Sequence, residues 1–404
     1  MRLSNSILRQ SRVLPSKLYA QRTFSTSPQW LQRTLPVFEE SSSPELHNLL
    51  QLAREKIIPI AALNMDQKKY LFSPRNKTTL ESDPLYIEFA NDEAVQLGYT
   101  NPLTDLPGKF RLFNEATDLA TTKEDWQNVS RLLKGIAQGE RLQAKLQERY
   151  IRLGIQAGHP SIVLGTVEAV EGSKVSLKVG ENLLYLLEGL RKYGFWSAED
   201  PEEASAWLVG AYTRVITMME HRKHCGAKNI AKDDLRRQPW VLAPLVEILG
   251  LRLKAGWDSA EKSAFGLYAA RLVDMLDVEA IENASSLPDI DLSIPKNRAV
   301  AKRLLLRWEP VYSALELIQE FQPQGVQLES VPLSRLIESL STNLDRTLAR
   351  SKEVASRTVE RDPPASWLSP EVVRWTRYTT LGRNISDAEM PTTAARDSVL
   401  GFSE

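Results

Sequence analysis

Helical periodicity of the apolar residues is the feature that most constrains this chain, because it recurs in segment after segment between residues 109 and 357. In one segment Trp126, Val129 and Leu133 fall three or four positions apart and form a single stripe. A capping side chain or a proline at the first helical position, such as Pro201, precedes several of these segments. The pattern predicts a mainly α-helical protein.

The expected helices follow one another with short connections. They span about 44–56 and 64–72, and from residue 109 onward they include 122–136, 140–157, 160–171, 183–194, 200–218, 239–254, 258–276, 297–321 and 333–357. Such an order indicates stacked helical hairpins, in an irregular α-solenoid or a bundle. Residues do not recur at the spacing of about 34 to 35 that tetratricopeptide and pentatricopeptide arrays require. The chain therefore resembles those families in helix pairing only, over about residues 109–276. Pro310 is expected to kink its helix.

One small β-hairpin is expected near residues 86–99. Apolar residues alternate with other residues on either side of the polar turn Asn91-Asp92, beginning at Ile87 and again at Val95. Because an isolated two-stranded ribbon is barely stable in water, this hairpin should lie against helices or pair elsewhere.

The first 38 residues hold six basic residues and no acidic one, and they are rich in serine. This composition is typical of a mitochondrial transit peptide, and arginines interrupt every apolar run that a secretory signal would need. The pattern after Arg22 resembles the processing sites of precursors imported into the matrix. Two cleavage positions fit that pattern: between Phe24 and Ser25, or between Leu31 and Gln32. We expect import into the mitochondrial matrix through the import and processing machinery.

These signals divide the chain into six parts. They are a cleaved presequence (1–31), N-terminal helices with the hairpin (32–107), a helical-hairpin domain (108–282), a linker (283–296), a C-terminal helical pair (297–358) and a mostly disordered tail (359–404).

Charge limits what the mature protein can bind. The full chain balances 51 basic and 51 acidic residues, and removal of residues 1–31 takes away five basic residues and leaves 46 against 51. Because the mature chain is mildly acidic, any contact with RNA or DNA has to be local. No apolar stretch approaches the roughly twenty residues that span a bilayer. The single cysteine, Cys225, excludes an internal disulfide.

The strongest local positive feature is the segment 221–237. Its basic residues are Arg222, Lys223, Lys228, Lys232, Arg236 and Arg237, against Asp233 and Asp234. Such a cluster suits the phosphates of RNA or the headgroups of anionic lipids, and a solvated loop between helices explains it equally well. A second basic run lies on a leucine-rich helix at Lys296, Arg298, Lys302, Arg303 and Arg307, where amphipathic packing is the simpler interpretation.

Reactive side chains cluster at His221, His224 and Cys225, and helical spacing would put all three on one face. The favoured interpretation is a helix C-terminus whose basic residues complement the helix dipole before Gly226 ends the helix. Metal ligation and redox chemistry are the alternatives. We expect no metal site. If the chain had one, His221, His224 and Cys225 would be its candidate ligands.

The tail contains one apolar island that either docks on the core or binds a partner. Its contact candidates are Trp367, Leu368, Val372 and Trp375.

Enzyme motifs are missing: the sequence has no phosphate-binding glycine loop, no nucleophile elbow and no dinucleotide fingerprint. We therefore expect a non-catalytic scaffold without a cofactor, acting in mitochondrial gene expression as a ribosome-associated or RNA-associated protein. The first alternative is an assembly factor or accessory subunit of a respiratory-chain complex at the inner membrane, with the 296–308 helix and the tail island as contacts. The second is a metal-dependent enzyme that uses His221, His224 and Cys225.

Overall fold

The computed structural model describes residues 34–90, 93–138, 142–196, 201–225, 230–231, 233–256, 261–323 and 332–358. Its helices are α1 (Pro44–Leu52), α2 (Ile58–Ala62), α3 (Met65–Phe72), α4 (Lys77–Ser82), α5 (Lys109–Leu119), α6 (Lys123–Ile136), α7 (Ala144–Gln156), α8 (Pro160–Glu168), α9 (Val170–Ser173), α10 (Gly180–Trp196), α11 (Pro201–Met219), α12 (Pro239–Ala255), α13 (Glu261–Asp274), α14 (Val278–Ser285), α15 (Pro295–Phe321) and α16 (Leu333–Thr358). Its strands are β1 (Leu85–Glu88) and β2 (Ala94–Leu97). The prediction of a mainly helical chain with one β-hairpin is confirmed.

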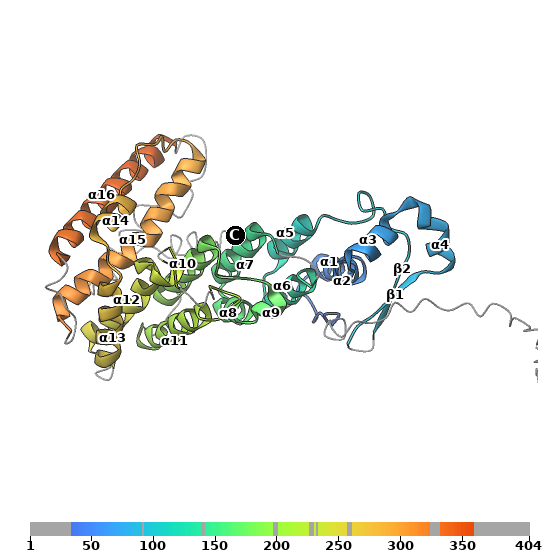
Figure 1. The fold of residues 1–404 in the computed structure, drawn as a ribbon, viewed down its shortest axis with the longest axis horizontal. Coiled ribbons are helices and arrows are strands. Elements are labelled where there is room, and N and C mark those ends of the chain that lie inside the picture. Colours follow the sequence, from blue (N-terminus) through green and yellow to red (C-terminus); the bar gives the residue numbers. More distant parts are fainter. Residues whose placement is uncertain are drawn as a thin grey trace, which may run out of the picture.

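The helices stack along the long axis of an elongated molecule. Figure 1 shows α1–α4 and the hairpin at one end and α13–α16 at the other. In the middle, α5, α7, α10 and α12 pack on one another in one layer, while α6, α8 and α11 form a second layer beside it. One apolar core runs through the stack from Leu35 to Leu344. This arrangement is an irregular solenoid of helical hairpins.

Helix boundaries largely follow local signals in the sequence. Asn64 and Thr122 each cap a helix in a capping box, and Pro44 and Pro239 begin α1 and α12 at the first turn. Two short helices, α4 and α14, were not predicted from the sequence. They have six and eight residues, too few turns for a clear apolar period.

The first expected helix is longer than its prediction, because α1 continues through a π-helical turn (Ala53–Ile57) into α2. Pro59 has no N–H to donate to the carbonyl four residues earlier, and the N–H of Ile58 bonds to the carbonyl of Ala53 instead. The wider turn keeps both helices in the core. Gly194 likewise does not end its helix: α10 continues to Trp196, and a Cβ at Gly194 would lie 2.3 Å from Leu208 Cδ1, so the glycine permits close packing on α11.

The hairpin pairs antiparallel, with Leu85 opposite Leu97 and Ile87 opposite Val95. Leu85, Ile87 and Leu97 are buried, while Tyr86 on the other face is exposed. One face of the ribbon therefore packs on the core, as its marginal intrinsic stability requires. The turn Asn91-Asp92 lies outside the described residues.

An extended segment, residues 34–42, lies along α6, and we name it the N-terminal strap. Asn128 exchanges two hydrogen bonds with the backbone of Glu39, at 2.9 and 3.0 Å. The Asp125 carboxylate accepts the Ser42 N–H at 3.0 Å and also the N–H groups of Thr121 and Thr122. Burial alone would raise the pKa of Asp125, but these hydrogen bonds lower it to about 2.

At the other end, α15 packs on α12 and α16, and α14 packs on α16. The helix α15 runs on through Pro310, which is buried. Between α14 and α15, Leu287 and Leu292 form a small apolar cluster with Ala301. In the described part of the chain no helix is long and apolar enough to cross a membrane.

Candidate functional site

The basic segment 221–237 connects α11 to α12. Helix α11 ends at Met219, and residues 220–225 form turns, with backbone hydrogen bonds such as His224 N–H to His221 O at 2.9 Å. The expectation that His221, His224 and Cys225 share a helical face before a stop at Gly226 is therefore wrong. Backbone N–H groups here bond to carbonyls three residues earlier, which makes the turns tighter than those of an α-helix. The side-chain spacing of an α-helix therefore does not apply.

Two of the six basic residues bind carboxylates of the fold. The Arg236 guanidinium donates to Asp234 at 3.0 and 2.8 Å and to Glu220 at 3.1 Å. Lys223 pairs with Glu171 at 2.9 Å. The hydrogen bond to Asp234 is the largest cause of a raised pKa at Arg236, which therefore keeps its charge. These contacts close the segment onto the solenoid.

Arg222 and Arg237 are exposed, and neither has a side-chain partner among the residues that the structure describes. Of the described cations of this segment, these two remain accessible to a ligand. Lys228 and Lys232 lie outside the described residues.

His224 is a structural residue. Its ring is 1% exposed, and Nδ1 accepts the N–H of Leu177 at 3.2 Å. Burial lowers the pKa of His224 to about 4, and the charge of His221 adds to this shift. Neutral His224 thus holds the loop before α10 against the turn after α11.

Cys225 is half-buried, and its thiol lies 3.9 Å from the carbonyl of Leu177. Burial raises the pKa of Cys225 to about 11, so the thiol is protonated at neutral pH and is a weak nucleophile. Within the described ranges no three histidine, cysteine or acidic side chains are grouped as metal ligands. The geometry gives these residues structural contacts.

A buried charge network, which the sequence analysis did not find, joins α10, α12 and α15. Arg191 makes two hydrogen bonds to the Glu247 carboxylate, at 2.9 and 2.8 Å, and its other nitrogen lies 3.7 Å from Glu309. Burial raises the pKa of Glu309 to about 7. Despite burial, the two carboxylates raise the pKa of Arg191. The only sequence signals were single charges inside leucine-rich helices.

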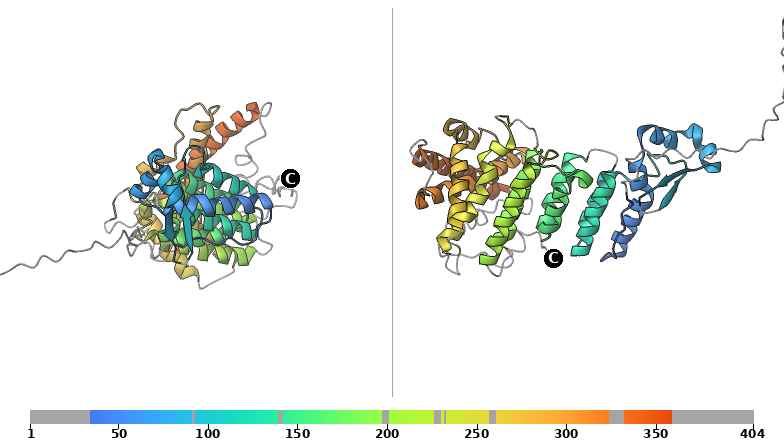
Figure 2. Two further views of the ribbon diagram at one scale, coloured as in Figure 1. Left: turned by 90° about the vertical axis from the view of Figure 1, so that its right-hand side faces the viewer. Right: turned by 60° about the horizontal axis from the view of Figure 1, so that its bottom comes forward.

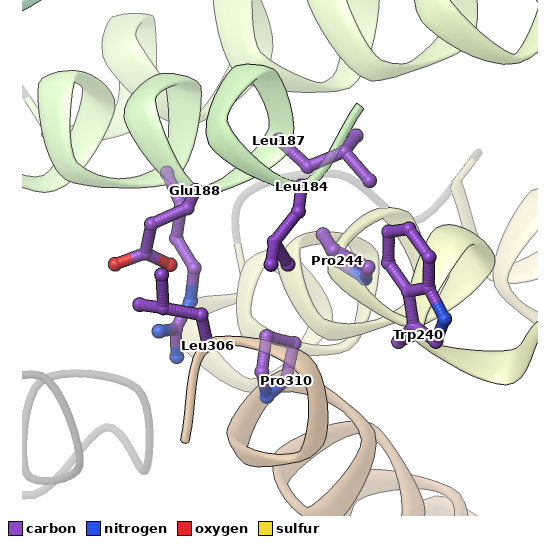
Figure 3. A pocket seen from close by; sticks show the side chains of 8 residues that line it. Leu184, Leu187, Glu188, Trp240, Pro244, Leu306 and Pro310 are labelled. Atoms are coloured by element: carbon purple, nitrogen blue, oxygen red, sulfur yellow. The ribbon is translucent and has the colours of Figure 1, made fainter. Parts of the chain in front are cut away.

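Beside this network is a small pocket (Figure 3). It has a volume of about 10 Å³, room for about one water molecule. Trp240 and Pro244 from α12, Leu306 and Pro310 from α15, and Leu184 from α10 line it. This size excludes an organic substrate, so the pocket marks where three helices meet.

The second basic run lies on the first half of α15, whose Leu305 and Trp308 are buried. The Arg307 guanidinium lies over the Trp240 ring at 5.4 Å, and the Lys302 ammonium lies 5.7 Å from the Tyr185 ring centre. The helix is amphipathic, and two of its cations rest on aromatic rings of α10 and α12.

The cleavage candidates Phe24, Ser25, Leu31 and Gln32 and the tail candidates Trp367, Leu368, Val372 and Trp375 lie outside the described residues. They remain predictions.

Comparison with known proteins identifies a family. A family model described as mitochondrial ribosomal protein mS27 matches residues 22–367. A curated relative, the small ribosomal subunit protein mS27 of Neurospora crassa, is 26% identical over 244 residues. That alignment covers 59% of this chain and spans 60% of the relative's length.

Proposed function

Because the chain belongs to the mitochondrial ribosomal protein mS27 family, we propose that it is a structural component of the small subunit of the mitochondrial ribosome. The observation that carries this proposal is the reach of the family match, residues 22–367, which includes every described helix. Ribosomal proteins are a non-catalytic family, in agreement with the lack of enzyme motifs in the sequence.

A mitochondrial ribosomal protein works in the mitochondrial matrix. The acid-free and arginine-rich first 38 residues supply the matching import signal. We propose that the presequence is removed at one of the two positions named above, and that the protein is held in the matrix by its ribosomal partners.

The elongated solenoid supports a scaffolding role. Helical stacks expose long surfaces on which each hairpin can meet a different neighbour. In a mildly acidic mature chain, contact with ribosomal RNA has to use local cations. Among the described residues of the 221–237 segment those are Arg222 and Arg237, since Lys223 and Arg236 already bind carboxylates of the fold.

Sedimentation of mitochondrial extracts tests the role. The endogenous protein should migrate with the small subunit in a sucrose gradient, and RNase or EDTA should shift it together with that subunit's RNA and proteins. If the protein stays at the position of a free monomer in every gradient, the proposal is wrong. Co-purification with respiratory-chain subunits that resists RNase would instead favour the assembly-factor alternative.

A further inference from the structure

The two basic runs, about seventy residues apart in the sequence, meet at the start of α10. The short 3₁₀ turn Leu235–Arg237 lies against that start, because a Cβ added to Gly180 would be 3.7 Å from Leu235 Cδ2. Arg237 is exposed at the end of this turn. The first run therefore ends beside the first residue of α10.

The second run reaches the same place from α15. Arg307 lies over the ring of Trp240, three residues after Arg237. It also interacts electrostatically with Glu181, the second residue of α10, and with Arg303 one turn away on its own helix. Figure 3 shows Trp240 of α12, Leu306 of α15 and Leu184 of α10 around the neighbouring pocket.

From there the positive charge continues along α15 and across α10 to α7. Lys302 lies over Tyr185, and burial together with the positive charges of Lys192 and Arg152 lowers its pKa to about 7, so that a nearby anion would favour its charged form. Tyr185 is also within electrostatic range of Arg303 and Arg152. We name the set formed by Arg152, Arg237, Lys302, Arg303 and Arg307 the basic belt.

Carboxylates neutralise only part of this surface. Glu148 binds Arg152 at 3.4 Å, and Glu188 binds Lys192 at 3.1 Å. Arg237, Arg303 and Arg307 have no ion-pair partner in the part of the chain that the structure describes. Burial and the neighbouring arginine oppose the charge on Arg307 more strongly than Glu181 supports it. An added anion would relieve this repulsion.

We propose that the basic belt binds the phosphate backbone of ribosomal RNA. This inference rests on the proposed function. The Arg307 guanidinium, supported on the Trp240 ring, is pre-oriented for phosphate and loses little side-chain freedom on binding it. An acidic protein partner fits less well, because protein interfaces need an apolar centre. None of the strongly exposed large apolar side chains of the described residues lies on α7, α10 or residues 300–308 of α15.

Binding of transcribed small-subunit mitochondrial ribosomal RNA to the full chain, measured across KCl concentrations, tests the belt. The variant R237Q/R303Q/R307Q should bind roughly tenfold or more weakly at 0.15 M KCl, and the slope of log affinity against log salt should fall by about two to three. The matched control, R75Q/K77Q/K123Q, removes three exposed charges from the turn before α4, from α4 and from the start of α6, and should leave affinity and slope near those of the wild type.

A second variant separates charge from folding. R303K/R307K keeps both charges, so it should retain most of the salt slope, and all four proteins should melt within a few degrees of one another. An unchanged affinity and slope in the glutamine variant would overturn the belt as an RNA site.

A photo-crosslinker at position 303 gives an independent readout in intact subunits. Capture of RNA is expected, and capture of protein alone would also overturn the inference. Failure of the wild-type protein to sediment with the small subunit would instead overturn the proposed function, whatever the belt binds in isolation.

Discussion

Arg191 on α10 and Arg307 on α15 both contact α12, but they have opposite roles. Arg191 is buried and binds the carboxylates of Glu247 and Glu309. Arg307 rests on the face of Trp240, and its buried Nε has no hydrogen-bond partner among the described residues. A charge that carboxylates of the fold bind directly holds helices together, whereas a guanidinium without an ion-pair partner among the described residues remains able to bind an anion. Arg236, which binds Asp234 and Glu220, differs in the same way from Arg237, which has no ion-pair partner among the described residues.

The test with the largest expected effect on stability removes a carboxylate that binds Arg191. We expect Glu247→Gln to lower the free energy of unfolding by about 3 to 5 kcal/mol, because it removes the carboxylate that accepts two hydrogen bonds from the buried Arg191 guanidinium. Urea unfolding at pH 7 measures the change. The control, Lys254→Gln, breaks the more exposed pair with Glu320 and should cost less than about 1 kcal/mol. Equal costs would contradict the distinction.

His224 should make stability depend on pH in the mildly acidic range. The folded state binds the ring proton less tightly than the unfolded chain, so stability is complete above the unfolded pKa of 6.5 and falls as pH drops towards about 4. The loss is at most about 3 kcal/mol. In His224→Asn the side-chain oxygen can replace Nδ1 as acceptor, and the difference in stability between pH 7 and pH 4.5 should shrink. Urea titrations at both pH values measure this difference, and an unchanged difference would contradict the role of His224.

The charge of Asp125 should affect the stability of the fold at a lower pH than that of His224. Its folded pKa of about 2 lies below the ordinary 3.8, so the carboxylate stabilises the fold above pH 4 and loses that effect as pH falls towards 2. We expect Asp125→Ala to cost about 2 kcal/mol at pH 7 and much less at pH 2.5, in thermal or urea unfolding. Glu124→Ala, at the exposed neighbouring position, is the control. A penalty that stays constant with pH would show that packing, and not charge, explains the effect.

The smallest stability effects should come from the charges that the fold leaves accessible. Arg307→Gln is expected to cost less than about 1 kcal/mol through its contact with Trp240. Arg237→Gln and Arg222→Gln should change stability by less than about 0.5 kcal/mol. Calorimetry of the three variants checks the order. If Arg237→Gln destabilises the protein as much as Glu247→Gln, the charge at position 237 belongs to the fold and is not free for RNA.

The sequence predicted the fold class because apolar period and capping residues act within one helix, as at Thr122 and Trp126. It did not predict the partners of charged residues. The pairs Arg191 with Glu247 and Arg236 with Glu220 join positions 56 and 16 residues apart, and only packing brings them together. The six basic residues of segment 221–237 therefore looked equivalent in the sequence, although two of them are bound in the fold.

The turn after α11 was misjudged for a related reason. His221 and His224 continue a helical pattern, but the helix ends at Met219 because Nδ1 of His224 binds the backbone before α10. Tertiary contact overrides local propensity at such helix ends. The division into domains and the role of the tail island remain predictions.

The N-terminal strap bears on the order in which the chain folds. Glu39 and Ser42 bind Asn128 and Asp125, 89 and 83 residues later in the sequence. Most helices instead pack on close neighbours in the chain and can form as soon as those neighbours are present. When the polypeptide emerges amino end first, the strap comes out early and yet stays unpaired until α6 follows. The first described residues of the protein should therefore be among the later ones of its N-terminal part to acquire protection against hydrogen exchange.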